Sequence, residues 1–240
     1  MILKIKPQYL LVLLSLRLIS LISCSSTEEV TTDSTCYASS SYCASPVSVT
    51  GISSATAISG GRDHMCSLIS GGTAKCWGDN YQGQLGNGST TDSSSPVSVS
   101  NISTATGINA GEDHTCAVLS DNTVQCWGYG LLGNLGNGSS SNSNTPVTVS
   151  NISTATAVAG GEDFNCALLS GGTISCWGNG SYGCFGNGTL GSSAVTNTPV
   201  INSSVNASSV AAGDDFTCIL ESGGTIKCFG DNDDGQLGAW

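Results

Sequence analysis

The sequence is poor in basic residues, with six Lys and Arg against 17 Asp and Glu among 240 residues. Charged residues are 10 % of the chain and aromatic residues 6 %, so Ser, Thr, Asn and Gly must cover most of the surface. Three of the bases are Lys4, Lys6 and Arg17, and a chain without them has three bases against 17 acids, a net charge close to -14. Such a surface repels phosphate groups, so we expect no nucleic-acid partner.

Sustained helical periodicity is also missing, and no apolar run reaches the roughly 20 residues that span a bilayer. The longest such run, from Tyr9 to Ser23, has about 15 residues and follows two lysines, which fits a secretory signal. Its end, Leu21-Ile22-Ser23-Cys24, resembles the lipobox of bacterial lipoproteins. The resemblance implies a signal peptide over residues 1–23, a lipid on Cys24, and a lipid anchor to the membrane in the bacterial cell envelope, at the outer membrane. The alternative is an ordinary cleaved signal with Cys24 incidental.

Residues 24–45 are rich in Ser and Thr, and we interpret them as a tether. Beyond the tether, the chain repeats itself. Pro46, Pro96, Pro146 and Pro199 recur at intervals of about 50 residues, which divides the chain into residues 46–95, 96–145, 146–198 and a shorter fourth repeat, 199–240. Each unit reads as four short strands, one of them made of small residues that suit a position near an axis. This pattern predicts an all-β propeller with one blade per repeat.

Two cysteines ten residues apart frame a hairpin in every repeat, as in "CSLISGGTAKCWG". Because their numbers are symmetric about the turn, the two face each other across an antiparallel pair, within reach of a disulfide. Export favours disulfides over metal ligands. The predicted pairs are Cys66–Cys76, Cys116–Cys126, Cys166–Cys176 and Cys218–Cys228.

Of the remaining cysteines, Cys36 and Cys43 can pair with each other, whereas Cys184 has no symmetric mate. We expect Cys184 to be a free or intermolecular thiol. The aromatic residue after the second cysteine of each hairpin (Trp77, Trp127, Trp177 or Phe229) is expected to pack between neighbouring blades, with an aromatic ligand cage as the alternative.

The segment "GGRDHMCSLISGGTAKCWGDNYQGQLGNG" (residues 60–88) resembles the repeat of the regulator of chromosome condensation family. The matching features are His64, His114, Trp77-Gly78, Gly83-Gln84-Leu85-Gly86 and Gly235-Gln236-Leu237-Gly238. The resemblance implies a propeller that usually has seven blades. Four repeats predict an incomplete arc of about four blades, so the chain is a fragment, or two chains complete one another, or the ring closes at an unusual number.

An aspartate stands at one position in every repeat: Asp63, Asp113, Asp163 and Asp215. These residues would form either a ring of carboxylates that binds a cation or a basic partner, or a structural Asp that accepts backbone N–H bonds in each blade. His64 and His114 become Phe164 and Phe216 in later repeats, so we expect packed rings rather than a catalytic or metal role. Residues 231–238, "DNDDGQLG", superficially resemble a calcium loop but lack the spacing of an EF-hand.

No set of acid, base and nucleophile emerges, so we expect no catalytic residue, no metal and no cofactor. The favoured function is a non-enzymatic exported lipoprotein that presents a disulfide-bonded propeller to a protein or glycan partner at the cell surface. The alternative is a regulatory propeller that acts on a protein partner, either as a nucleotide-exchange factor or as an enzyme inhibitor. Self-association through open blade edges or through Cys184 is a further expectation.

Overall fold

The computed structural model describes residues 46–238, which contain fifteen β-strands and one short 3-10 helix, η1 (Gly191–Ala194). The strands form four antiparallel sheets, three of four strands and one of three. The first sheet has β1 (Ala55–Gly60), β2 (His64–Ile69), β3 (Thr73–Gly78) and β4 (Ser93–Ser98). The second has β5 (Ala105–Ala110), β6 (His114–Leu119), β7 (Val124–Gly128) and β8 (Ser143–Thr148). The third has β9 (Ala155–Gly160), β10 (Phe164–Leu169), β11 (Ile174–Asn179) and β12 (Val195–Asn202), and the last has β13 (Ala207–Ala212), β14 (Phe216–Glu221) and β15 (Ile226–Gly230).

The predicted signal peptide, the tether, Cys24 and the Cys36–Cys43 pair lie outside the described residues. The chain from Val49 onward forms one compact unit. Within residues 46–238, no helix is long and apolar enough to cross a membrane.

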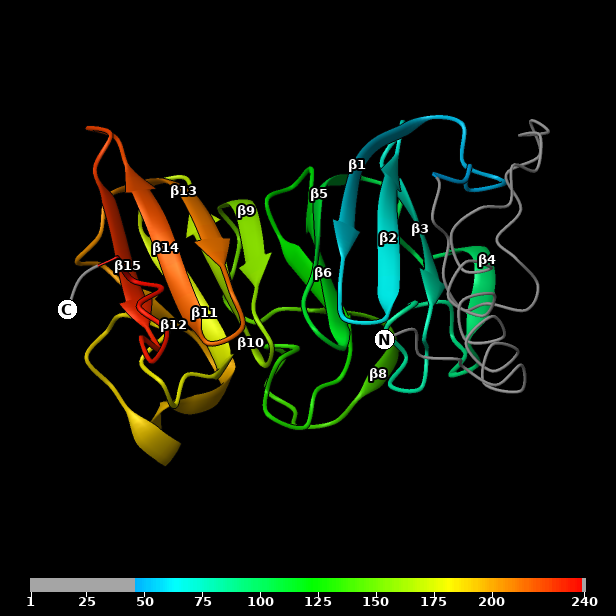
Figure 1. Ribbon diagram of the computed structural model, residues 1–240. Coiled ribbons are helices and arrows are strands. Elements are labelled where there is room, and N and C mark those ends of the chain that lie inside the picture. Colours follow the sequence, from blue (N-terminus) through cyan, green and yellow to red (C-terminus); the bar gives the residue numbers. More distant parts are fainter. Residues whose placement is uncertain (1–45, 239–240) are drawn as a thin grey trace, which may run out of the picture. The chain divides into compact units, whose positions relative to one another are not determined.

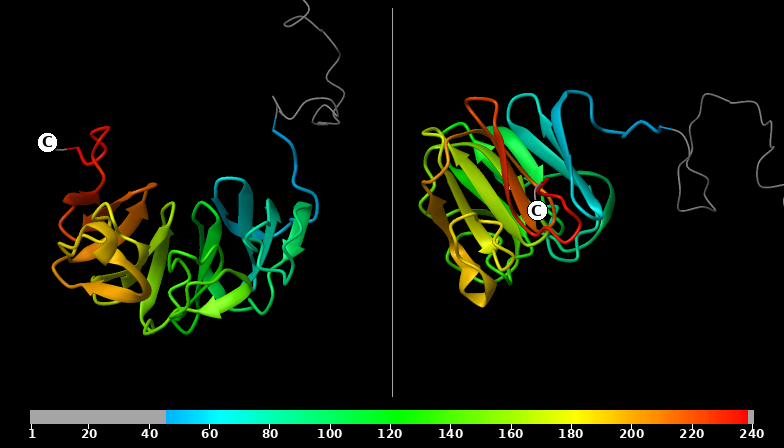
Figure 2. Two further views of the ribbon diagram at one scale, coloured as in Figure 1. Left: turned by 90° about the horizontal axis from the view of Figure 1, so that it is seen from below. Right: turned by 60° about the vertical axis from the view of Figure 1, so that its left-hand side comes forward.

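Within this unit the four sheets follow one another in chain order (Figure 1). The inner strand of each sheet contacts the inner strand of the next, β1 with β5, β5 with β9 and β9 with β13. The row of sheets is not closed, and in Figure 2 the first and fourth sheets lie at its opposite ends. These features confirm the predicted all-β fold, an incomplete propeller of four blades.

Small side chains in the inner strands let neighbouring sheets approach closely near the axis. The amide of Gly160 donates to Asn109 Oδ1 of the preceding inner strand at 2.6 Å, and the amide of Ala110 donates to Ser59 Oγ at 2.9 Å. Bulky side chains would separate these strands, since the hydrogen bonds need the two backbones side by side. The strands of small residues therefore lie where the sequence predicted them.

Three of the four proline-led segments form the outermost strand of a sheet, whereas residues 46–50 are not part of a strand. β4, which contains Pro96, pairs with β3 of the first sheet, and β8 and β12 pair in the same way with β7 and β11. An outer strand tolerates proline because one of its edges needs no hydrogen bonds to a further strand. The segment that begins each new repeat in the sequence therefore supplies the fourth strand of the preceding sheet.

A disulfide joins the second and third strands of every sheet: Cys66–Cys76, Cys116–Cys126, Cys166–Cys176 and Cys218–Cys228. In each case the two cysteines are direct register partners, as hairpin symmetry requires. The distance between their Cα atoms is 4.1 Å in all four. This matches the closer, non-hydrogen-bonded type of antiparallel pair, in which facing side chains are nearest to each other.

The core consists of three apolar clusters, one at each junction between neighbouring sheets. The first combines Cys66, Leu68 and Leu85 of the first sheet with Trp127 of the second. Trp127 and Trp177 are fully buried in successive clusters. Burying a Trp removes about 200 Å² from water, a contribution of about 5 kcal/mol at about 25 cal/mol per Å². The prediction that these aromatic rings pack between blades is confirmed.

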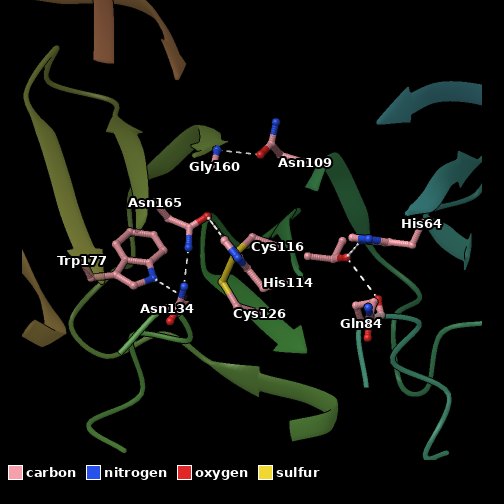
Figure 3. The surroundings of a disulfide bond; sticks show 11 residues. His64, Gln84, Asn109, His114, Cys116, Cys126, Asn134, Gly160, Asn165 and Trp177 are labelled. Carbon is pink, nitrogen blue, oxygen red and sulfur yellow. Dashed lines mark hydrogen bonds between the residues drawn. A yellow bond between two sulfur atoms is a disulfide. The ribbon is translucent and has the colours of Figure 1, made fainter. Parts of the chain in front are cut away.

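A glycine loop of one sheet contacts the aromatic ring of the next. The indole N–H of Trp127 donates to the carbonyl oxygen of Gln84 at 2.8 Å. Figure 3 shows the equivalent bond at the next junction, where the indole N–H of Trp177 donates to the carbonyl of Asn134, also at 2.8 Å. Gly86 lies so close to the Trp127 ring that an added Cβ would be 2.7 Å from its Cδ1 atom. The Gly-x-x-Gly and Trp-Gly motifs of the repeat are therefore two halves of one inter-sheet junction.

Candidate functional site

An open hollow lies where the four inner strands end. It has a volume of about 580 Å³ and is lined by all four sheets. A glycine followed by a charged residue reaches it from each sheet, and these charged residues are Arg62, Glu112, Glu162 and Asp214. We call this hollow, with these four side chains, the acidic mouth.

Local backbone geometry holds the charged residues at the rim. The amide of Gly61 donates to the carbonyl of His64 at 2.9 Å, which makes a tight turn between β1 and β2, and Gly111 repeats this with His114 at 3.0 Å. A Cβ atom on Gly111 would collide with the His114 ring and approach the Gly161 carbonyl oxygen. Only glycine fits such a close approach. The amide of Glu162 also donates to the Asp214 carbonyl at 2.9 Å, which ties the third sheet to the fourth.

Arg62 is the cation of the acidic mouth. Its guanidinium forms ion pairs with Asp63 at 3.4 Å, with Asp113 at 2.7 Å and with Glu112. The other two bases in the described residues are Lys75 and Lys227, which bond to the Gly51 carbonyl and to Glu221 respectively. Arg62 therefore offsets part of the negative charge of the first two sheets at the mouth.

The side formed by the third and fourth sheets is anionic. Burial, together with the charges of Glu162, Asp231, Asp163 and Asp214, raises the pKa of Asp215 to about 6. When like charges raise the pKa of a carboxyl, binding a proton or a positively charged group relieves the repulsion and lowers the electrostatic energy of the site. The electrostatics of this half of the mouth suit a cationic side chain of a partner.

The four repeated aspartates flank the mouth, because each directly follows a lining residue. Their backbone carbonyls accept the amide that follows the third strand of each sheet, for example Tyr129 N–H to Asp113 at 2.9 Å and Asp231 N–H to Asp215 at 3.0 Å. The backbone, rather than the carboxylate, thus makes the bond that recurs in every sheet. Three of the carboxylates have other partners, since Asp63 and Asp113 pair with Arg62, and Asp163 accepts from Asn134 Nδ2 at 3.3 Å.

Burial raises the pKa of Asp113 and of Asp163, the first against the opposing effect of Arg62 and the second against that of the Asn134 hydrogen bond. The aspartates of neighbouring sheets also sense each other, because the charge of Asp63 raises the pKa of Asp113 and that of Asp163 raises the pKa of Asp215. The structure therefore brings them into one electrostatic group, although Glu112, Glu162 and Asp214 form the lining.

His64 and His114 lie inside the sheet junctions. His64 Nε2 is 2.8 Å from Thr115 Oγ1, and His114 Nε2 is 3.0 Å from Asn165 Oδ1 (Figure 3). Burial lowers the pKa of both imidazoles to about 4, with the charge of His114 a second cause for His64. Both rings are packed and neutral at pH 7, as expected from their replacement by phenylalanine in the later repeats.

Cys184 is a free thiol and is buried in the third cluster. Its Sγ lies 3.4 Å from the Asn179 carbonyl, and burial raises its pKa to about 12. The expectation of a free cysteine agrees with this position. The idea that it links two chains is wrong, because a fully buried sulfur cannot reach another chain.

The calcium-like segment, residues 231–238, bonds to itself. Gln236 Nε2 donates to Asp231 Oδ2 at 2.6 Å, and Leu237 N–H donates to Asn232 Oδ1 at 3.0 Å. Leu85 and Asn80 repeat the second bond in the first sheet, also at 3.0 Å. Among the described residues no group of three or more His, Cys, Asp or Glu could hold a metal ion. This segment is the ordinary loop of the repeat.

Sequence comparison identifies the repeat. A profile described as the regulator of chromosome condensation (RCC1) repeat matches residues 73–118 and 121–168, and a second profile of the same description matches residues 55–84, 105–134, 155–191 and 207–236. The chain belongs to the RCC1 repeat family. No curated protein matches it.

Solved structures of similar fold include other RCC1-type propellers. Yeast RCC1 (Prp20), solved with Kap60, has a TM-score of 0.66 and 21% identity, covering 77% of this chain and 46% of its own. Prp20p from Saccharomyces cerevisiae has a TM-score of 0.65 and 21% identity, with coverage of 79% and 49%. Human WBSCR16 has a TM-score of 0.64 and 22% identity, with coverage of 72% and 46%. The chain thus spans about half the length of these structures, and at this identity they establish the RCC1 fold alone.

Proposed function

We propose that this RCC1-repeat chain is a non-enzymatic, exported lipoprotein, anchored through Cys24, whose disulfide-bonded propeller arc binds a partner at the bacterial cell surface. The observation that carries the proposal is the acidic mouth, a hollow of about 580 Å³ rimmed by charges on a rigid frame. Loops held by a rigid scaffold are where binding residues commonly lie.

The disulfides support export. A disulfide joins the second and third strands of every described sheet, and six of these eight cysteines are fully buried. Disulfides persist in oxidising compartments and are rare in a reducing cytosol. The Ser/Thr-rich segment of residues 24–45 and the lipobox-like end at Cys24 support the same location outside the cell.

The absence of enzymatic activity is supported by the state of particular residues. A general base needs a pKa near the working pH and reach to the substrate, whereas His64 and His114 are buried with pKa values of about 4. A thiol nucleophile needs a lowered pKa, whereas that of Cys184 is raised to about 12.

The charges of the mouth favour a protein partner with exposed Lys or Arg over a glycan. Proteins of the same fold bind proteins, since yeast Prp20 was solved with Kap60 and Prp20p is described as binding Gsp1p and histones. In the acidic half of the mouth, where the pKa of Asp215 is raised to about 6, a basic side chain of the partner would relieve the repulsion among the carboxylates.

Capture from envelope extract tests this function. The matched variants are Glu162→Gln/Asp214→Asn, which removes two carboxylates from the mouth, and Asp233→Asn/Asp234→Asn, which removes two exposed ones from an outer loop. We expect the mouth variant to bind the captured partner about tenfold more weakly, because two exposed charge contacts contribute about 0.7 kcal/mol each. The loop variant should bind like the wild type. Equal binding by all three would show that the mouth is not the site.

Intact mass tests the export part separately. A mass that starts at Cys24 with acyl chains, and that rises on reduction of the hairpin disulfides and the Cys36–Cys43 pair, is the expected result. An unmodified mass with free thiols would overturn export. In that case the regulatory alternative gains support, and a nucleotide-exchange assay or an inhibition assay with the captured partner would test it.

A further inference from the structure

The two ends of the described unit carry the two halves of the junction that joins its sheets. Two junctions combine a Gly-x-x-Gly loop of one sheet with the Trp ring of the next, and the third has Phe229 in place of Trp. Within residues 46–238, Trp77 of the first sheet meets no such loop, and the loop Gly235–Gly238 of the last sheet meets no aromatic ring. We call the first surface the head face (Val49, Ile58 and Trp77) and the second the tail face (Ile226, Gln236, Leu237 and Gly238).

The head face exposes what the inner sheets bury. Ile58 on β1 is 70% exposed, whereas its equivalents Ile108 and Val158 pack against the core clusters. Val49 is 41% exposed, whereas Val99 is buried in the first junction. Trp77 is only half-buried, in contrast to the fully buried tryptophans of the second and third sheets.

The tail face is complementary. Ile226 on β15 is 67% exposed, whereas its equivalents Val124 and Ile174 are fully buried. Gly238 has a φ of +70°, close to the +65° of Gly86 at the first junction. Among residues 46–238, no atom lies within 4 Å of a Cβ built on Gly238, whereas a Cβ on Gly86 would meet a Trp ring. The tail loop therefore has the backbone shape that receives an aromatic ring at the internal junctions.

A hollow of about 560 Å³ marks the tail face, with Ile226, Phe229 and Leu237 in its lining. Within the described residues β15 is the outermost strand of its sheet, whereas β3, β7 and β11 each pair with a fourth strand. Residues 46–50, "PVSVT", have almost the sequence of the outer segments "PVSVS" (96–100) and "PVTVS" (146–150). The chain thus contains a matching outer-strand sequence just before its head face.

We propose that the head face of one copy docks on the tail face of a second copy, head to tail, and so rebuilds the internal junction between two chains. Trp77 packs on Gly238, its indole N–H donates to the carbonyl of Gln236, and Ile58 covers Ile226. Residues 46–50 of the docking copy then lie beside β15 as its outer strand. The occupant is a second copy because both halves of the junction are already built to fit each other.

The polar contacts of this interface are balanced. At the first two junctions the side chains of Thr115 and Asn165 each donate a second hydrogen bond to the loop carbonyl that accepts from the Trp indole. Met65 occupies the equivalent position of the head face and has no side-chain donor, so Trp77 supplies the one donor to the Gln236 carbonyl in the proposed interface. The third junction also has one donor. The side chain of Phe229 has no N–H, so Thr217 Oγ1 is the side-chain donor to the Cys184 carbonyl, at 2.8 Å. A junction with one such hydrogen bond therefore already exists within the chain.

Native mass spectrometry of the full chain, released from detergent micelles, tests the proposal. We expect the wild type to assemble as two or more copies, and Ile58→Asp (head) and Ile226→Asp (tail) each to be a single chain. The matched control is Ile201→Asp on β12, an isoleucine that is 65% exposed and lies on neither face. Because all three side chains are exposed, the variants should fold, which far-ultraviolet circular dichroism checks.

Mixing the two variants makes the test specific to the head-to-tail arrangement. The intact head of Ile226→Asp can dock on the intact tail of Ile58→Asp, so an equal mixture should form dimers that contain one chain of each. A wild type that stays single, assembly that survives either variant, dissociation of the Ile201→Asp control, or a mixture that stays single would each overturn the proposal. None of these outcomes depends on the acidic mouth, so failure here is distinguishable from failure of the proposed binding function.

Discussion

At the scale of residues, the position after each repeated aspartate shows which substitutions a sheet junction accepts. It is His64, His114, Phe164 and Phe216 in successive repeats. His64 contacts Thr115 at the first junction, and the third junction has Phe164 and Thr217 at the equivalent positions, where Thr217, like Thr115, donates to a loop carbonyl. The junction therefore needs a flat ring at this position, and the imidazole hydrogen bond is an addition to it.

The histidines make stability depend on pH. An unfolded imidazole takes up a proton near pH 6.5, while His64 and His114 in the fold have pKa values of about 4. Between these values the unfolded state binds more protons, so the free energy of unfolding falls as the pH falls from 6.5 to 4, by about 3 kcal/mol for each histidine.

In the variant His64→Phe, the free energy of unfolding should fall with pH by about half as much, because one of the two buried imidazoles is gone. The variant should still fold, because the third junction has Phe164 at the equivalent position. Urea denaturation at several pH values measures the effect. Asp215, whose pKa of about 6 is raised, acts in the opposite direction: its contribution increases stability as the pH falls through 6. It is present in both proteins and cancels in the comparison. Identical pH profiles for the variant and the wild type would contradict the neutral, buried state of His64.

A second prediction at this scale concerns glycines in the loops. Gly136 has a φ of +62°, and an added Cβ would be 2.8 Å from Cδ1 of Trp177, whereas Gly138, with a φ of +85°, has no atom within 4 Å. Gly138→Ala should cost about 1–2 kcal/mol for the left-handed backbone alone. Gly136→Ala should cost a further 1–3 kcal/mol or so, because the new methyl overpacks the junction. Urea unfolding compares them, and equal losses would argue against close contact with the ring.

At the scale of elements, the disulfide hairpin is the stable unit of every sheet. The pair Cys116–Cys126 closes a loop with a sequence separation of 10, and such a loop contributes about 3 kcal/mol by the chain-entropy account. The double variant Cys116→Ala/Cys126→Ala should lose at least this much in urea unfolding. The Cys218–Cys228 disulfide closes a loop of equal length, but its cysteines are only half-buried. The double variant Cys218→Ala/Cys228→Ala should therefore lose less free energy of unfolding than the first variant, because it removes less buried packing. A smaller loss for the fully buried pair would contradict this order.

At the scale of the whole molecule, the described unit resembles a repeat array, since each sheet packs mainly on its neighbours in the chain. Stability in such an array is approximately a sum of repeat and junction contributions, so the ends should open first. In Ile58→Asp, which we expect to be a single chain, amides of β1 and β15 should exchange faster with solvent than those of β6 and β10. Hydrogen exchange read by mass spectrometry measures this. Uniform protection across the four sheets would contradict it.

The same measurement links the ends to assembly. In the wild type, copies joined head to tail would cover β1 and β15, so protection at both should rise above that of Ile58→Asp, while β6 and β10 stay unchanged. Protection that rises equally everywhere would indicate general stabilisation rather than an interface at the two ends.

The sequence by itself determined the repeat, the strands and the facing cysteines, because these follow from spacing along the chain. The period of about 50 residues sets one sheet per repeat, and residues symmetric about a hairpin turn must face each other. The packing of Trp127 and Trp177 between sheets could be predicted for the same reason, since their position alternates with that of the cysteines.

Only the tertiary structure decided which residues of different repeats meet. Spacing does not show that Arg62 pairs with Glu112 and Asp113 of the next sheet, nor that Glu112, Glu162 and Asp214 rather than the repeated aspartates line the mouth. The same holds for the partner of each Gly-x-x-Gly loop, and for the burial of Cys184. These contacts join residues 30 or more positions apart, so they depend on how one sheet is set against the next, which the side chains of a single repeat do not encode.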